Sequence, residues 1–163
     1  MEHAVGVLRA AGLTRVHVVL GAAAEAVREQ ADLAGCVVVE NPEWERGMGS
    51  SLRAGLESLS SSGARAALVS LVDQPGIAAE AVARVLAGFM DEDSLVSAAY
   101  DGVRGHPVLF GAAHWAGIAE SATGDRGARA YLKAHADAVA LVECGDAARP
   151  YDIDTEADLV HLE

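Results

Sequence analysis

The segment Ala67–Gly76, ALVSLVDQPG, constrains the fold more than any other stretch of the chain. Its residues before Asp73 are apolar apart from Ser70, and a proline follows Asp73 by two positions. A continuous apolar run without alternation is typical of a strand covered on both faces, as in the parallel sheets of α/β proteins. Asp73 would then lie at the carboxyl end of that strand, the edge where open α/β sheets bind ligands. We therefore predict a buried strand that ends in a carboxylate.

This carboxylate has two interpretations. A carboxylate at the ligand-binding edge of a sheet can hold Mg²⁺ against a phosphate, because Mg²⁺ prefers oxygen ligands and shares its shell with substrate phosphates. Asp73 is equally well explained as a turn residue ahead of a helix. The segment alone leaves both interpretations open.

Composition and charge narrow the class of protein. The 163 residues are 52% hydrophobic, which suits a single domain with a substantial core. The formal net charge of −12, with Lys133 the only lysine, argues against a nucleic-acid-binding surface. Because a negatively charged protein repels a polyphosphate, the binding of such a ligand would depend on local arginines and a divalent metal.

The sequence also indicates the compartment. No apolar run approaches the roughly 20 residues that a membrane span needs, and the first residues lack the features of a signal peptide. Cys36 and Cys144 border apolar strand-like runs without metal-ligand spacing, so we expect two buried free thiols. A cytoplasmic protein with no membrane partner is the expectation.

Strand-like and helix-like segments alternate along the chain, which predicts a parallel α/β sheet with helical crossovers. The pair Asp101 and Gly102 separates two strand-like runs and favours an antiparallel hairpin. Helices are expected at residues 2–11, 22–33, 50–59, 78–90, 112–120 and 127–135, and strands at 15–21, 36–41, 67–73, 94–100, 103–111 and 137–144.

A glycine-punctuated loop precedes the helix expected at residues 50–59. Gly47 and Gly49 allow the backbone to approach a ligand closely. Ser50 and Ser51 stand at the helix start, where free N–H groups and the helix dipole favour an anion. Ordinary serine capping of the helix is the alternative explanation.

Two further polar segments are candidates for ligand binding. His106 lies in a Gly-His-Pro triplet that should interrupt its strand, and it either donates to a ligand or is a turn histidine beside an edge proline. Asp125, Arg126 and Arg129 cluster before a helix. The arginines suit a phosphate, but such a group is also an ordinary solvated ion cluster.

The last motif is DIDT, residues 152–155. Asp152 and Asp154 alternate with Ile153, so both carboxylates should fall on one side of an extended segment. Thr155 and Asp158 resemble a capping box for a terminal helix. Helix capping explains the presence of Thr155 and Asp158, but it does not explain why Asp152 and Asp154 should lie on one side.

Taken together, five motifs carry a family resemblance over essentially the whole chain. They occur in the order NPEWERGMGSSLRAGL, VDQP, GVRGHPVLF, GDRGAR and DIDTEADL. This set resembles the MobA-like nucleotidyltransferases, and most closely the branch that contains the molybdenum cofactor cytidylyltransferases. The resemblance implies a Rossmann-like three-layer α/β/α sandwich with a mostly parallel sheet and an antiparallel hairpin. It also implies Mg²⁺-dependent transfer of a nucleotidyl group from a nucleoside triphosphate to a phosphate acceptor.

In that branch CTP and a molybdopterin-type cofactor give the cytosine dinucleotide cofactor and pyrophosphate, and a molybdoenzyme would be the client. The resemblance assigns Asp73 as the principal Mg²⁺ ligand and Asp154 as the second, with Asp152 as a substitute for Asp154. No nucleophilic side chain is required. The residues that would contact the nucleotide are Asn41, Gly49, Ser50 and Ser51, and those that would face the acceptor are His106, Asp125 and Arg129.

The sequence departs from the family at one place. Family members begin with a strand and a glycine-rich loop of the type LAAGxSxRMGxxK, and no such segment occurs in residues 1–163. We expect a single domain without that strand and loop, either a truncated relative or a partial reading of a longer gene, which alone binds nucleotide poorly. The strand at 15–20 and the strand ending at Asp73 should then either pair directly or leave a gap of roughly 9 to 10 Å.

Two other functions remain open. Some relatives in high-GC bacteria are described as NAD(P)H-dependent reductases of pyridine-derived pigments, although this chain shows no dinucleotide-binding glycine fingerprint. A non-catalytic chaperone that handles the cofactor is the other alternative. The retention of both the DQP and DIDT motifs weighs against it.

Overall fold

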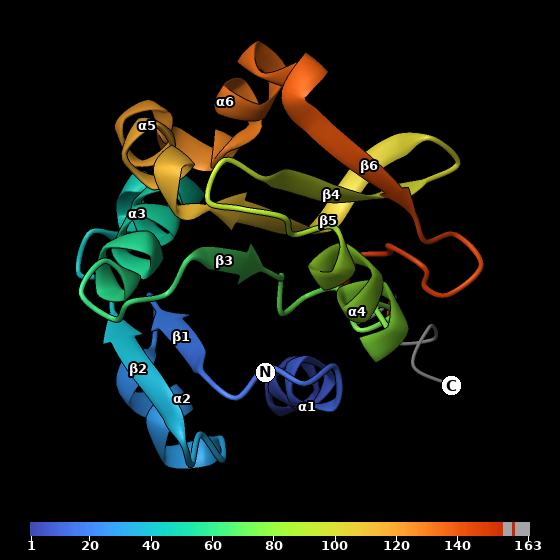
Figure 1. The fold of residues 1–163 in the computed structure, drawn as a ribbon. Coiled ribbons are helices and arrows are strands. Elements are labelled where there is room, and N and C mark those ends of the chain that lie inside the picture. The colour runs from blue at the N-terminus through green and yellow to red at the C-terminus, as the bar shows by residue number, and fades with distance from the viewer. Residues whose placement is uncertain (155–157, 159–163) are drawn as a thin grey trace.

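The computed structural model describes residues 1–154 and 158, and Thr155 therefore lies outside the described residues. Each helix and strand expected from the sequence is present (Figure 1). In chain order they are α1 (Glu2–Ala10), β1 (Val16–Leu20), α2 (Ala24–Gln30), β2 (Cys36–Glu40), α3 (Met48–Leu59), β3 (Ala66–Val69), α4 (Ala79–Ala87), β4 (Leu95–Tyr100), β5 (Val103–Gly111), α5 (Trp115–Ser121), α6 (Arg129–Ala134) and β6 (Val139–Glu143).

The strands form two sheets. One has the order β3-β5-β4-β6, in which β5 runs antiparallel to β3 and β4, while β4 and β6 are parallel. The other is the parallel pair β1 and β2. Asp101 and Gly102 connect β4 to β5 with φ angles of 52° and 77°, as a two-residue turn between twisted strands requires. The expected hairpin is confirmed, and within the four-stranded sheet β5 runs antiparallel to both of its neighbours.

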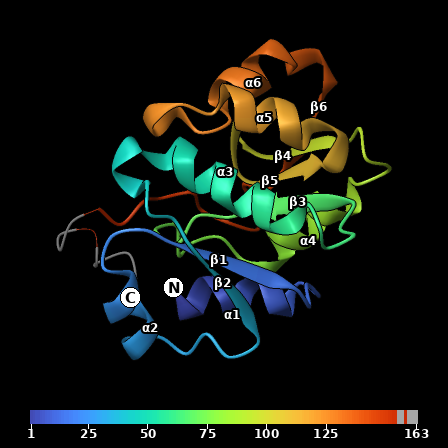
Figure 2. The same ribbon diagram turned by 90° about the vertical axis from the view of Figure 1, so that its left-hand side faces the viewer.

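Helices cover both faces of the sheets, which confirms the three-layer arrangement (Figures 1 and 2). On one face Val82 and Val85 of α4 pack with Val96 of β4, and α1 lies beside them. On the other face Phe110 of β5 packs with Ile118 of α5 in a core that α3 and α6 complete. No helix within the described residues is long and apolar enough to cross a membrane.

The strand that contains Ala67 is shorter than expected. It ends at Val69, so Asp73 lies in the turn that follows and not at the strand's last position. Only Ala67 of this strand is buried, and Val72 is 57% exposed. The expectation of a strand covered on both faces as far as Val72 is therefore wrong. The physical reason is that β3 pairs with β5 along one edge only, while a cavity lies on its other side.

That cavity separates the two sheets. No described strand pairs with both β1 and β3, and these two strands do not pair with each other. Instead, Val16–Val19 and Ala66–Val69 line the same cavity of about 1210 Å³, together with residues of α1 and α3. Of the two arrangements expected from the sequence, the structure has the open one.

Candidate functional site

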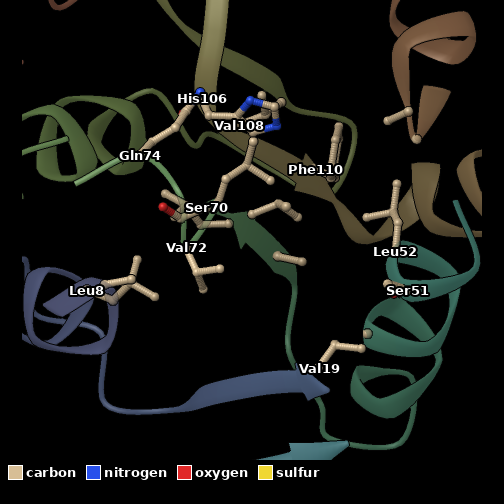
Figure 3. Close-up of a pocket in the computed structure, with 18 of the residues that line it drawn as sticks. Leu8, Val19, Ser51, Leu52, Ser70, Val72, Gln74, His106, Val108 and Phe110 are labelled. Carbon is tan, nitrogen blue, oxygen red and sulfur yellow. The ribbon is translucent and has the colours of Figure 1, made fainter. Parts of the chain in front are cut away.

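His106 and Gln74 lie together in one part of the cavity between the sheets, which we call its polar end, and six of the site residues expected from the sequence line the cavity. Figure 3 shows the apolar part, with Val19 and Leu52 among the side chains that line it, and the polar part around His106 and Gln74. The expected residues that line the cavity are Ser51, Asp73, His106, Asp125, Arg129 and Asp152, and Arg104, Gln74 and Arg126 join them. Asn41, Gly49, Ser50 and Asp154 are not part of the lining.

Backbone hydrogen bonds hold the turn that carries Asp73 against the segment near the end of the chain. The Ile153 N–H donates to the Asp73 carbonyl at 2.8 Å, and the Arg149 N–H donates to the Gly76 carbonyl at 3.0 Å. A Cβ on Gly76 would collide with the Arg149 carbonyl oxygen, so this approach requires glycine. The DQP and DIDT motifs therefore meet through main-chain contacts that fix both segments.

Two buried oxygens in this turn lack a hydrogen-bond partner among the residues that the structure describes. They are Asp73 Oδ1 and Gln74 Oε1. Buried acceptors without a donor are rare in folded proteins, because each costs free energy that a hydrogen bond would offset. Oxygen atoms without donors are the ligands that Mg²⁺ and Mn²⁺ prefer, so this turn fits a divalent cation.

The three expected metal ligands are not gathered together. No group of three histidine, cysteine, aspartate or glutamate side chains within residues 1–154 and 158 is arranged to hold a metal. Asp154 is exposed and outside the cavity lining, and its N–H donates to Asp158 Oδ2 at 3.2 Å. Asp73 and Asp152 share the cavity, so a cation there would need phosphate oxygens and water to complete its shell.

His106 lies where the pairing of β5 with β4 is irregular. The register shifts between Ser97 and Ala99, opposite the Gly-His-Pro triplet, as the sequence predicts. The Tyr100 hydroxyl donates to the His106 carbonyl at 2.7 Å and Ser97 Oγ donates to the Gly105 carbonyl at 2.9 Å. Burial raises the pKa of Tyr100 to about 12, so its hydroxyl remains a donor. These bonds hold the irregular segment in place.

The charges around the His106 ring come from both motifs. Burial is the main cause of the lowered pKa of His106, and Arg104 and Arg129 lower it further. Asp73 and Asp152 act in the opposite direction. The lowered pKa favours the neutral form of the ring near pH 7.

The Asn41 side chain and its partners form a closed hydrogen-bond network. Asn41 is 4% exposed, and its Nδ2 donates to Ser50 Oγ at 2.8 Å and to Ser51 Oγ at 3.0 Å. Its Oδ1 accepts from the Glu43 N–H at 3.0 Å, and Ser50 Oγ lies 2.8 Å from the Gly47 carbonyl. These atoms bind the loop to itself, and of the three side chains only Ser51 reaches the cavity.

Gly47 and Gly49 allow a close approach between chain segments. A Cβ at Gly47 would lie 2.6 Å from Asp125 Oδ1, and one at Gly49 would lie 2.9 Å from the Ala122 carbonyl carbon. The Met48 N–H, the first of α3, donates to Asp125 Oδ1 at 3.4 Å. The helix therefore begins slightly before Ser50, and the Asp125 carboxylate occupies the position near its positive end where an anion was expected.

Sequence reasoning missed two side chains of the polar end. Gln74 stands beside Asp73 in the DQP motif, and its amide could have been examined as a partner for an acid. Arg104 is two residues before His106 in β5, and residues at that spacing share one face of a strand.

Comparisons with known proteins bear on this geometry. The model of the MobA-like NTP transferase domain matches residues 1–139. The chain belongs to the MobA-like NTP transferase family. It is 34% identical to the nicotine blue oxidoreductase of Paenarthrobacter nicotinovorans, in an alignment that covers 99% of this chain and 81% of that protein.

Two solved structures are also similar to this family member. The homologue of Mycobacterium tuberculosis Rv0371c from Mycobacterium sp. strain JC1 is 29% identical, with a TM-score of 0.79 over 99% of this chain and 79% of the other. Rv0371c of M. tuberculosis in complex with manganese is 28% identical, with a TM-score of 0.76 over 98% and 83%. Family membership supports nucleotidyl transfer as the reaction class, and manganese is bound in the M. tuberculosis structure.

Proposed function

We propose that this protein transfers CMP from CTP to a molybdopterin-type cofactor and releases pyrophosphate. The observation that carries the proposal is the buried Asp73 Oδ1, which has no hydrogen-bond partner in the described part of the chain and lies in a cavity that arginines also line. A carboxylate in that position supplies a cation ligand, and the arginines supply partners for phosphate oxygens.

Asp73 would hold the divalent ion, with a second oxygen from the DIDT segment. When bound, the ion would neutralise part of the charge on the transferring phosphates. The oxygens that lack donors in this turn make the residues fit such an ion. Since the ion needs only one or two carboxylates beside phosphate and water, a larger cluster of acids is not required.

The remaining polar side chains would position the two substrates. Arg104, Arg126 and Arg129 supply guanidinium groups beside the three aspartates of the lining, and a chain with a net charge of −12 needs such groups in order to hold a triphosphate. The neutral His106 ring would hydrogen-bond the acceptor, and the Ser51 hydroxyl would contribute from α3. Their roles are binding and orientation, which dominate catalysis of phosphoryl-type transfers.

The reaction needs no nucleophile from the protein. A terminal phosphate oxygen of the acceptor would form the new bond to the α-phosphorus of CTP. The bond from that phosphorus to the bridging oxygen would break, and pyrophosphate would leave with the electron pair.

The test is pyrophosphate release from CTP, ATP and GTP, each with Mg²⁺ or Mn²⁺ and with or without a molybdopterin-type acceptor. Each nucleotide is raised to high concentration, because residues 1–163 contain no glycine-rich triphosphate loop and weak nucleotide binding is expected. We expect release from CTP that depends on the acceptor and on the metal. Release from another nucleotide would correct the base, and the absence of release from all three would overturn the proposal.

The second candidate is reduction of a pigment with a nicotinamide cofactor. The relative that carries the name nicotine blue oxidoreductase favours it. The assay is oxidation of NADPH or NADH, followed by absorbance, with a pyridine-derived pigment as acceptor. Oxidation that depends on the pigment, without any nucleotidyl transfer, would favour this candidate over the first.

A further inference from the structure

The side chain of Gln74 connects the two motifs of the polar end. Its Nε2 donates to Asp152 Oδ1 at 2.6 Å, which joins residues 78 positions apart in the sequence. Because a carboxylate at neutral pH only accepts hydrogen bonds, the amide NH₂ must face Asp152. Gln74 Oε1 therefore points away from Asp152, and it is the buried acceptor without a partner described above. The orientation of the amide is thus determined by chemistry.

This bond distinguishes Asp152 from Asp154, the other acid of the same segment. Asp152 lines the cavity with Asp73, and both carboxylates act on the His106 ring. Asp152 and Asp154 are both exposed, but Asp154 is not part of the lining and has its backbone N–H bonded to Asp158. The resemblance favours Asp154 as the second metal ligand, whereas the contacts favour Asp152.

Building on the proposed function, we propose that Gln74 is a positioning residue that holds the Asp152 carboxylate at the cavity. Asp152, and not Asp154, then joins Asp73 in binding the divalent cation. The turn carrying Gln74 is fixed by the Ile153–Asp73 main-chain bond, so its amide has a stable base from which to orient the acid. Side chains that orient metal ligands typically contribute about 10- to 100-fold in metal affinity.

The experiment is a titration of the full chain with Mn²⁺ in the absence of nucleotide, in which electron paramagnetic resonance measures the free ion. The variants are Asp152→Asn, Asp154→Asn, Gln74→Met and the double variant Gln74→Met with Asp152→Asn. We expect Asp152→Asn and Gln74→Met each to weaken Mn²⁺ binding about 10- to 100-fold. Asp154→Asn should bind as the unchanged protein does.

The double variant distinguishes an effect of Gln74 through Asp152 from a general disturbance of the local structure. If Gln74 acts through Asp152, the double variant should bind Mn²⁺ no more weakly than Asp152→Asn alone, because coupled residues are not additive. Thermal unfolding of each variant controls for folding. Gln74→Leu replaces Gln74→Met if the latter does not fold, and the comparison of Asp152 with Asp154 does not depend on either.

Three results would overturn the proposal. They are no Mn²⁺ binding by the unchanged protein, a loss in Asp154→Asn as large as in Asp152→Asn, or full additivity in the double variant. These results are distinct from failure of the proposed function. If the protein releases pyrophosphate from CTP but binds Mn²⁺ independently of Gln74 and Asp152, the proposed function stands and the role of Gln74 and Asp152 is refuted. If Mn²⁺ binding responds to the variants as expected but no nucleotidyl transfer is measured, the proposed function is refuted and the role of Gln74 and Asp152 stands.

Discussion

Two polar regions of this protein were both expected to bind substrate, and they differ in how their buried atoms are satisfied. In the loop from Asn41 to Ser51, the Asn41 amide has protein partners for both its nitrogen and its oxygen. In the turn at Asp73, two buried oxygens have no partner within residues 1–154 and 158. A satisfied buried group stabilises the chain, whereas an unsatisfied one costs free energy that a ligand can recover. The first region therefore supports the site, and the second is where the ligand should bind.

The largest expected effect tests the unsatisfied region. Asp73→Asn should lower CTP-dependent pyrophosphate release about a hundredfold or more, because the carboxylate charge that would hold the cation is lost. It should lower the free energy of unfolding by less than about 1 kcal/mol, because Asp73 Oδ1 has no hydrogen bond to lose. Steady-state kinetics and urea unfolding measure the two quantities. Unchanged turnover in Asp73→Asn would show that this acid is not the metal ligand.

Asn41→Ala tests the satisfied region and should have the opposite result. It removes a buried amide that holds Ser50, Ser51 and the Glu43 N–H, so we expect a loss of about 1 to 3 kcal/mol in the free energy of unfolding. Mn²⁺ affinity should stay unchanged, because Asn41 does not line the cavity. Urea unfolding and the Mn²⁺ titration provide both readouts.

Ser51→Ala is the matched control for that experiment. It removes one acceptor and leaves the bond from Asn41 to Ser50 in place, so the loss of stability should be smaller. A weaker Mn²⁺ affinity in Asn41→Ala, with stability unchanged, would reverse the roles assigned to the two regions.

Gly47→Ala tests the contact between the satisfied loop and Asp125. Gly47 has a φ of 96°, and its Cβ would lie 2.6 Å from both Asp125 Oδ1 and the backbone carbonyl carbon of Gly124. We expect the substitution to destabilise the protein by more than about 1 kcal/mol, since both the backbone conformation and the space oppose it. Thermal or urea unfolding provides the measurement.

Gly63→Ala separates the two causes. Gly63 also has a positive φ, 72°, but nothing lies within 4 Å of its Cβ position. Gly63→Ala should therefore show the backbone cost alone and be the milder change. Equal losses in the two variants would mean that the approach of Asp125 does not require the glycine.

Much of the fold could be predicted because it depends on local patterns. Apolar periodicity located the helices and strands, and the Asp101-Gly102 pair located the hairpin. The end of β3 at Val69 could not be predicted, since it depends on which neighbouring strand supplies hydrogen bonds and where a cavity opens.

The same distinction applies to the site. Residue type and family order pointed to Asp73, His106 and Arg129, and all three line the cavity. The enclosed position of Asn41 depends on contacts that no local pattern encodes. The bond from Gln74 to Asp152 also joins segments that are far apart in the sequence, so only the fold reveals it.

The smallest expected effect comes from a polar group that has partners but lies in solvent. Hydrogen bonding to Arg84 lowers the pKa of Asp146 to about 2, and the Arg84 guanidinium lies 2.7 Å from Asp146 Oδ1. Because the pKa is lower in the folded than in the unfolded protein, the pair contributes stability above about pH 4 and loses it as pH falls toward 2. The difference in unfolding free energy between the unchanged protein and Arg84→Gln should therefore be small at pH 7 and shrink between pH 4 and pH 2. Urea unfolding at these pH values measures it.

The pH dependence of the Arg84→Gln effect shows how much a polar pair contributes when water can reach it, which is the reference for the buried groups at Asn41 and Asp73. Arg84 and Asp146 are well paired, so if pairing alone determined stability, Arg84→Gln would cost as much as Asn41→Ala. Solvent screens an exposed pair and leaves it a modest contribution, whereas a buried amide that loses its network has no water to replace its partners. A difference that persists unchanged at pH 2 would show instead that Arg84 stabilises the protein through contacts that do not titrate, namely its 3.1 Å bond to the Glu143 carbonyl and the packing of its aliphatic stem. Even in that case, the larger loss of stability in Asn41→Ala would have to come from the burial of the Asn41 amide together with its hydrogen bonds.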